Sequence, residues 1–183
     1  MITKSQSTIE DLYKIAENGK AELVNGEIIL MSPTGSLPNR AGGNIYISLR
    51  QYEKRTKRGL AYTDNVGYAV KLPDRDSFSP DVSFYVGKPT GMKFLEGAPT
   101  FAVEIRSEND YGTKEDEKIK QKIRDYFLAG TQVVWDVDLI GSPTIKAYFA
   151  HNPDNPIIFC RGEIVHAEPV LSGWSMPVDE LFE

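Results

Sequence analysis

The sequence predicts an α/β fold, on two observations. Between residues 100 and 138 a strand pattern, a helical pattern and a second strand pattern follow one another, which is the order of a right-handed βαβ crossover with parallel strands. Farther upstream, two apolar runs flank Asn25-Gly26, the dipeptide that best tolerates the positive φ angles of a two-residue hairpin turn. A hairpin near the N-terminus and a βαβ unit in the middle of the chain are therefore expected.

Two helices are predicted in the N-terminal third. In the first, Ser7 and Glu10 form a capping-box pattern, and apolar residues recur at helical spacing as far as Ala16, before "ENG" ends the helix. The second follows the turn-rich "SPTGSLPNRAGG". Its apolar residues recur on one face, which comprises Ile45, Leu49 and Tyr52.

The third helix has the clearest pattern. Its start is predicted at Thr113, with Asp116 as the capping partner three residues on, and its end at Gly130. The apolar stripe follows the i, i+4, i+7, i+8 rule and comprises Ile119, Ile123, Tyr126 and Phe127. A helix at this place completes the βαβ unit.

Short strands are predicted before and after that unit. "LAYTD", "GYAVKL", "DVSFYV" and "TFAVEI" are β-branched or aromatic runs separated by Gly, Pro, Asp and Asn. In the C-terminal part, "TIKAYF", "PIIFC", "EIVHAEPV" and "GWSMPVDELF" have the same character, and Pro177 is expected to begin a last helical turn.

Length and composition indicate one domain, residues 1–183, of a globular protein with 40% hydrophobic and 26% charged residues. No run approaches the roughly 20 apolar residues that span a bilayer, so no membrane association is expected. The single cysteine, Cys160, cannot form an internal disulfide, and the N-terminus lacks the apolar stretch of a secretory signal. A cytoplasmic location is therefore expected.

The net charge of -5 counts against a protein that binds DNA through a broad basic surface. A metal-dependent nuclease is an exception, because it concentrates acidic groups in its site and lets the cation reverse the local field. Net charge therefore leaves this class of enzyme open.

Glu104 is the most unusual residue of the predicted strands, because it interrupts the apolar run "TFAVEI". Strands of a βαβ unit are usually covered on both faces, and an ionised carboxylate buried without a partner costs several kcal/mol. Glu104 must then be protonated, paired or bound to a cation. Arg106 lies two residues on and on the same strand face, so an ion pair between them is the simplest alternative.

A second carboxylate favours the cation. Asp81 begins the strand pattern "DVSFYV", and if this strand pairs with the one that bears Glu104, the two side chains converge at one edge of the sheet. Two adjacent carboxylates repel each other unless a cation lies between them, and oxygen ligands suit Mg²⁺ or Mn²⁺. Ordinary turn chemistry after "DSFSP" is the alternative for Asp81.

Lys122 is the third candidate. At about 100° per residue it lies at the margin of the apolar stripe of the third helix, so its ammonium can bend toward the sheet. A cation there could orient an attacking water and offset charge on a scissile phosphate. A lysine that extends along the edge of a buried face is the alternative.

The segments "AELVNGEIILMSP", "PDVSFYV", "PTFAVEIRS" and "KIRDYFLAGTQVVWDVD" resemble the Uma-two (Uma2) family of putative restriction endonucleases, within the PD-(D/E)xK nuclease superfamily. The resemblance covers about residues 22–138. It implies a restriction-endonuclease-like core, a mixed β-sheet flanked by helices, with Asp81 and Glu104 as ligands of Mg²⁺ or Mn²⁺. It also implies that Glu22 is a third acidic residue of the site, as a ligand or a holder of water.

The resemblance further implies a mechanism, in which the cation activates a water that attacks a DNA phosphorus. Lys122 would position the nucleophile or neutralise the transition state, and the Ile105 carbonyl is a candidate extra ligand. Two positions depart from the family pattern. Arg106 stands where the superfamily's lysine usually stands, which makes it a candidate for contacting phosphate rather than a base, and Asn39 stands where a histidine is frequent.

Two other functions remain open at this level. One is a non-catalytic interaction protein, for instance a homodimer, that retains the nuclease scaffold with Asp81 and Glu104 as structural partners. The other is a glycosidase in which Glu104 and Asp81 act as acid and base without a metal. Metal dependence separates these functions from the endonuclease.

Overall fold

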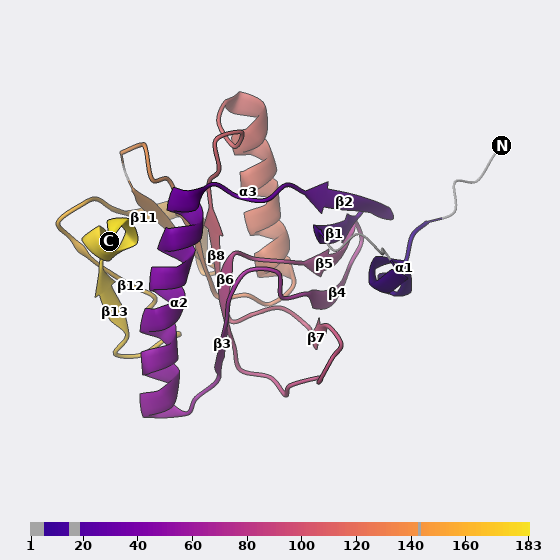
Figure 1. Ribbon diagram of the computed structural model, residues 1–183, viewed down its shortest axis with the longest axis horizontal. Helices are drawn as coiled ribbons and strands as arrows, with labels where there is room; N and C mark the ends of the chain where they lie inside the picture. Colours follow the sequence, from indigo (N-terminus) through magenta and orange to yellow (C-terminus); the bar gives the residue numbers. More distant parts are fainter. Residues whose placement is uncertain (1–5, 15–18, 143) are drawn as a thin grey trace.

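Within residues 6–14, 19–142 and 144–183, which the computed structural model describes, two mixed sheets are flanked by helices (Figure 1). The larger sheet has the order β11-β10-β9-β8-β6-β3, and the smaller has the order β2-β1-β5-β4-β7. The larger sheet comprises β3 (Leu60–Tyr62), β6 (Val82–Tyr85), β8 (Phe101–Ile105), β9 (Val133–Val137), β10 (Ile145–Phe149) and β11 (Asn152–Phe159). The smaller comprises β1 (Lys20–Val24), β2 (Glu27–Met31), β4 (Tyr68–Leu72), β5 (Arg75–Phe78) and β7 (Leu95–Glu96).

The predicted βαβ unit is confirmed. β8 and β9 pair in parallel, from Phe101 opposite Val133 to Ile105 opposite Val137, and α3 (Thr113–Leu128) connects them. The other pairs of the larger sheet are antiparallel. The sheet is therefore mixed, as expected from the sequence.

The two faces of the larger sheet have different coverings. α2 (Ser36–Thr56) packs on one face together with the C-terminal segment, which forms β12 (Ile164–His166), β13 (Ser175–Pro177) and the 3₁₀ helix η1 (Val178–Phe182). α3 and strands of the smaller sheet pack on the other face. Successive side chains of a strand alternate between faces, so Phe101, Val103 and Ile105 join the α2 side. Ala102 and Glu104 are left to face α3.

The N-terminal hairpin forms at the predicted turn. Asn25 and Gly26 have φ angles of 52° and 70°, the left-handed values that a two-residue hairpin turn requires.

The cap of α1 (Ile9–Lys14) differs from the prediction by one residue. Thr8 and Asp11 exchange the capping hydrogen bonds, where Ser7 and Glu10 were predicted, because Thr8 directly precedes the helix. Ala16 lies outside the described residues.

The two long helices confirm their predicted apolar faces but not every predicted end. α2 already begins at Ser36, inside the segment predicted to be turns, since Pro38 is compatible with the first turn of a helix. The capping box predicted at Thr113 is wrong. Gly112 caps α3 without a side-chain hydrogen bond, and the Asp116 carboxylate binds Arg106 instead. None of the described helices has the length and apolar character of a membrane span.

Candidate active site

Two carboxylates lie opposite each other in the larger sheet, Asp81 directly before β6 and Glu104 in β8. β6 and β8 are antiparallel and pair Val82 with Val103, so the next residues along, Asp81 and Glu104, lie level with each other. The Asp81 N–H donates to the Val103 carbonyl over 3.1 Å, and the Ile105 N–H donates to Asp81 Oδ2 over 2.7 Å. These bonds hold the Asp81 carboxylate beside the strand that bears Glu104.

Two side chains of α3 bind the Glu104 carboxylate. Lys122 Nζ donates to Oε2 over 2.8 Å, and the Tyr126 hydroxyl donates to Oε1 over 2.6 Å. The two donors are four residues apart and so occupy the same side of the helix. Lys122 does bend toward the sheet from the margin of the apolar stripe. Lys118, one turn earlier, is exposed and pairs with Glu115.

Glu22 lies in β1 and is buried beside the same lysine. Its Oε1 is 2.8 Å from Lys122 Nζ and accepts the Ser79 N–H over 2.8 Å, while Oε2 is 2.6 Å from Arg75 Nη1. Arg75 Nε in turn donates to Asp125 Oδ2 on α3 over 2.9 Å. Lys122 and Arg75 thus tie Glu22 to α3, and Lys122 links it to Glu104 in the larger sheet.

Lys20, also in β1, approaches the acidic pair from the other side. Its Nζ is 2.5 Å from Asp81 Oδ1 and 2.8 Å from Asp64 Oδ1. Lys20 and Glu22 are two residues apart on one strand, so their side chains share a face of the smaller sheet. Lys20, Lys122 and the three acids form one cluster, which we call the acidic centre (Asp81, Glu104, Glu22, Lys20 and Lys122).

The charges of the acidic centre shift one another's protonation. Burial raises the pKa of the Glu104 carboxyl above its usual range, and the charges of Asp81 and Glu22 reinforce this against the opposing effect of Lys122. Burial also acts to raise the pKa of Glu22, but Lys122 and Arg75 outweigh it and bring the pKa below its usual range. The two acids therefore differ, with Glu22 the more firmly ionised.

The pKa values of the two lysines are both raised. Burial by itself would lower the pKa of Lys20, but the carboxylates of Asp81 and Glu104 outweigh burial, and the pKa lies above its usual range. The pKa of Lys122 is raised in the same way by Glu104 and Glu22. Both ammonium groups are thus charged and stabilised by the acids around them.

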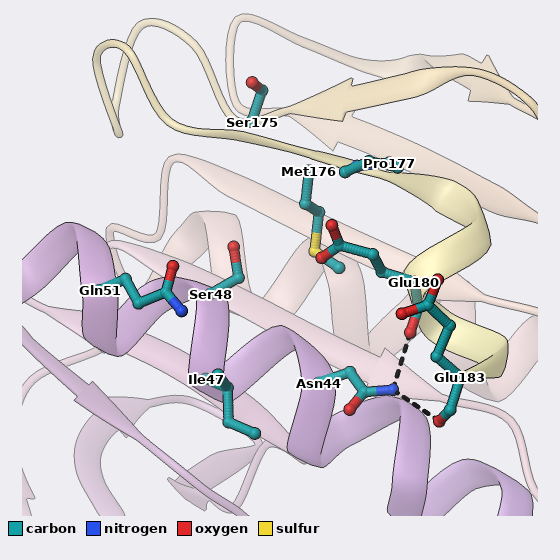
Figure 2. A pocket seen from close by; sticks show the side chains of 9 residues that line it. All are labelled: Asn44, Ile47, Ser48, Gln51, Ser175, Met176, Pro177, Glu180 and Glu183. Carbon is teal, nitrogen blue, oxygen red and sulfur yellow. Dashed lines mark hydrogen bonds between the residues drawn. The ribbon is translucent and has the colours of Figure 1, made fainter.

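A pocket of about 280 Å³ opens beside Asp81 and Ile105. Its other wall is the N-terminal part of α2, with Asn39, Gly42 and Gly43. A larger pocket, of about 360 Å³, lies elsewhere, between α2 and the C-terminal segment (Figure 2). Figure 2 shows Asn44 in that pocket, bonded to main-chain oxygens of η1 and the C-terminus, and no residue of the acidic centre lines it.

Arg106 does not pair with Glu104, which was the simplest alternative from the sequence. Its guanidinium donates a hydrogen bond to each carboxylate oxygen of Asp136, both over 2.8 Å. It also donates to Asp116 Oδ1 over 2.7 Å. The side chain is only 8% exposed. All three guanidinium nitrogens have protein acceptors, so the phosphate contact predicted for Arg106 would require at least one of these bonds to break.

The donors of the acidic centre suit a hard divalent cation. Mg²⁺ is commonly held by one or two carboxylates together with water and substrate phosphate, and it needs no cage of protein ligands. Asp81 and Glu104 supply two carboxylates that are 24% and 17% exposed, so each retains access to solvent. Across the described ranges, no three or more acidic, histidine or cysteine side chains are grouped as a metal site. The fit to Mg²⁺ or Mn²⁺ rests on the two carboxylates of Asp81 and Glu104.

Four residues around the acids were not predicted as parts of the site: Lys20, Arg75, Asp125 and Tyr126. Lys20 had a signal, because it lies two residues before Glu22 and so on the same strand face. Tyr126 had one as well, because it follows Lys122 by one helical turn. No sequence signal pointed to Arg75 or Asp125, because their contact forms only where β5 and α3 pack together in the folded protein.

Comparisons with known proteins agree with this architecture. A family model for Uma2, described as a putative restriction endonuclease, matches residues 8–179. The fold is similar to that of a putative nuclease of the DUF820 family from Anabaena variabilis ATCC 29413, with a TM-score of 0.73 and 18% identity over 96% of this chain and 97% of that chain. No curated protein matches the chain. The predicted fold, a restriction-endonuclease-like core with a mixed β-sheet flanked by helices, is confirmed, and the structure divides its strands between two mixed sheets.

Proposed function

The chain belongs to the Uma2 family of putative restriction endonucleases, and from this premise we propose that it is a metal-dependent DNA endonuclease whose reaction takes place at the acidic centre. The observation that carries the proposal is the pairing of β6 with β8, which sets Asp81 level with Glu104. Mg²⁺ or Mn²⁺ is the proposed cofactor, held by these two carboxylates, with the Ile105 carbonyl as a further candidate ligand.

The bound cation would supply Lewis acidity and a water of lowered pKa for attack on phosphorus. The chain's own residues do the remaining work. Lys122 holds a positive charge between Glu104 and Glu22, where it can orient a water and offset charge that develops on the phosphate. Glu22 keeps Lys122 in place, and the Tyr126 hydroxyl orients the Glu104 carboxylate. Glu22 is thus proposed to act through the lysine.

The pocket beside Asp81 is the proposed place for the scissile phosphodiester. The side of the pocket that α2 forms is open at Gly43, because a Cβ atom built on this residue would have no neighbour within 4 Å. Asp81 of the acidic centre lines this pocket, whereas the Glu104 side chain faces α3 on the other side of the sheet. A phosphate could therefore approach Asp81 without crossing a bulky side chain. With a chain of net charge -5, binding of DNA is expected to depend strongly on the cation.

The proposal predicts metal-dependent cleavage that requires Asp81. Purified protein is expected to nick or linearise plasmid DNA with Mn²⁺ or Mg²⁺, and to lose this activity in EDTA. Asp81→Ala is expected to lower the initial rate by at least about a hundredfold, because one ligand and its charge are removed. Gel electrophoresis of supercoiled plasmid over time measures both effects.

Asp154→Ala is the matched control, since Asp154 is an exposed acid of β11, outside the acidic centre. It is expected to cleave at the wild-type rate. Cleavage that persists in EDTA, or an Asp81→Ala variant as active as Asp154→Ala, would contradict the proposal. Circular dichroism shows whether each variant is folded.

A non-catalytic interaction protein is the second candidate, and one observation favours it. Asp81 and Glu104 each have a lysine partner within the protein, at 2.5 and 2.8 Å, which is also what a purely structural ion-pair network requires. Calorimetry with Mn²⁺ and cleavage assays on single-stranded, double-stranded and branched DNA distinguish the two. Folded protein that binds Mn²⁺ and cleaves none of these substrates favours the interaction protein.

We also propose a homodimer formed through β2, an edge strand of the smaller sheet. Ile29 and Leu30 of β2 are 46% and 64% exposed, so apolar side chains are exposed on both faces of this edge. β11, an edge of the larger sheet, is instead interrupted by Pro153 and Pro156, which cannot donate to a further strand. β2 lacks this protection. Antiparallel pairing with a second copy would place each Glu27 at opposite ends of the joint strand pair.

Leu30→Lys tests this surface. The wild type is expected to sediment as a dimer and Leu30→Lys as a monomer, because a charge on an edge strand disfavours strand pairing. Met92→Lys is the control, since Met92 is 99% exposed outside the sheets. Analytical ultracentrifugation of the three proteins gives the masses, and a monomeric wild type would contradict the dimer.

We further propose that residues 1–183 form one domain and that the protein is cytoplasmic. One core cluster supports the first point, because it joins Ala41 and Ile45 of α2 to Val178 and Leu181 near the C-terminus. The single cysteine, Cys160, supports a cytoplasmic location, since one cysteine cannot form the internal disulfides that are typical of secreted proteins.

A further inference from the structure

We propose that Lys20 is an internal competitor of the divalent cation, so that metal binding at Asp81 requires the Lys20 ammonium to move toward Asp64. The inference rests on the proposed function and adds a regulatory property to it. Neither the sequence patterns nor the family resemblance assigns a role to Lys20. The contacts of its ammonium group are the starting point.

Lys20 occupies the free side of the Asp81 carboxylate. Oδ2 of Asp81 is already engaged by the Ile105 N–H at 2.7 Å, and Oδ1 lies 2.5 Å from Lys20 Nζ. The Lys20 side chain is 14% exposed, so water screens this pair only in part. A divalent ion that approaches Oδ1 would therefore meet the positive charge of Lys20 at close range. The two cations exclude each other from this oxygen.

Lys20 also has another carboxylate available. Its Nζ lies 2.8 Å from Asp64 Oδ1, and the Asp64 side chain is 44% exposed. Asp64 belongs to the loop between β3 and β4 and borders the same pocket as Asp81. The ammonium can thus leave Asp81 and remain paired, which keeps the cost of its displacement low.

Lys122 differs from Lys20 in this respect. Both carboxylates that contact Lys122 Nζ, Glu22 and Glu104, belong to the acidic centre, and Glu22 is buried and ionised. Moving Lys122 would leave the Glu22 charge with one cationic partner fewer in the interior, which is costly. Lys122 is therefore expected to stay in place during metal binding, while the Lys20 ammonium is displaced from Asp81.

Calorimetry with Mn²⁺ tests the competition without any cleavage assay. Lys20→Met is expected to bind Mn²⁺ about tenfold more tightly than the wild type, because no ammonium has to be displaced. Lys20→Arg retains a cation that can bind Asp81 and is expected to remain close to the wild-type affinity. Lys20→Gln replaces Lys20→Met if the latter does not fold, and the same increase is expected.

Lys118→Met is the charge-matched control, since it removes one positive charge from α3 at an exposed pair with Glu115. It is expected to leave the affinity unchanged. Equal affinities in Lys20→Met, Lys118→Met and the wild type would overturn the role of Lys20 while leaving the metal site intact. Binding of Mn²⁺ by none of these proteins would overturn both the metal site and the competition.

Movement of the ammonium has its own readout. In NMR spectra of protein labelled with ¹⁵N-lysine, the Nζ signal of Lys20 is assigned by its loss in Lys20→Arg. Saturating Mg²⁺ is expected to shift this signal, because the group exchanges Asp81 for Asp64. A Lys20 signal that stays unchanged at saturating Mg²⁺ would contradict displacement, even if the affinities differ.

Discussion

Glu104→Gln is expected to lower the rate of DNA cleavage by at least about a thousandfold and to leave the protein folded. Glutamine retains the shape of the side chain and one oxygen that can accept from Lys122 or Tyr126, so the packing between β8 and α3 is preserved. It loses the negative charge, and with it the attraction for a divalent cation next to Asp81. Initial rates of plasmid cleavage at saturating Mn²⁺ measure the change.

The control for this variant is Glu117→Gln, the same substitution at an exposed residue of α3 that pairs with Lys120. Its rate is expected to equal that of the wild type. Melting curves for both variants separate loss of activity from loss of fold. A folded Glu104→Gln protein that cleaves within about tenfold of the wild type would remove Glu104 from the reaction.

Arg75→Met is expected to lower the free energy of unfolding by about 3–5 kcal/mol, the largest effect on stability that we predict. Arg75 binds Glu22 on β1 and Asp125 on α3, at 2.6 and 2.9 Å, and its side chain is buried. Methionine fills similar space but removes the positive charge that pairs with the interior carboxylates of Glu22 and Asp125. Lys122 then remains as the cationic partner of Glu22. Urea denaturation followed by circular dichroism measures the difference.

Arg124→Met is the matched control, because Arg124 is exposed on the same helix and next to Asp125. It is expected to change stability little. Adding Asp125→Asn to Arg75→Met is expected to recover part of the loss, since one of the uncompensated charges is then removed. Equal stability of Arg75→Met and Arg124→Met would show that the buried pairs contribute little.

The residues whose place in the fold the sequence indicated share a local signal. Glu104 stood out because it interrupts an apolar strand, and the expectation that it faces a partner needed only the strand's alternation. Lys122 was placed by the helical period at the margin of an apolar stripe, and the structure brings it to Glu104. The hairpin at Asn25-Gly26 followed from the positive φ angles that this turn requires.

The residues that were misjudged or missed depend on partners from distant parts of the chain. Arg106 lies on the face that alternation predicts, but Asp136 of β9 and Asp116 of α3 bind it in place of Glu104. Asp116 could not serve the predicted cap for the same reason. Lys20 reaches Asp81 and Asp64 only because the hairpin of β1 and β2 packs beside the larger sheet.

The sequence by itself determined most of the elements, their apolar faces and the candidate acids Asp81 and Glu104, because periodicity and turn chemistry act over a few neighbouring residues. Tertiary structure alone decided which cation meets which carboxylate. An ion pair forms between side chains that the fold brings within a few ångströms, and each buried charge selects its partner by geometry and desolvation, which spacing along the chain does not encode.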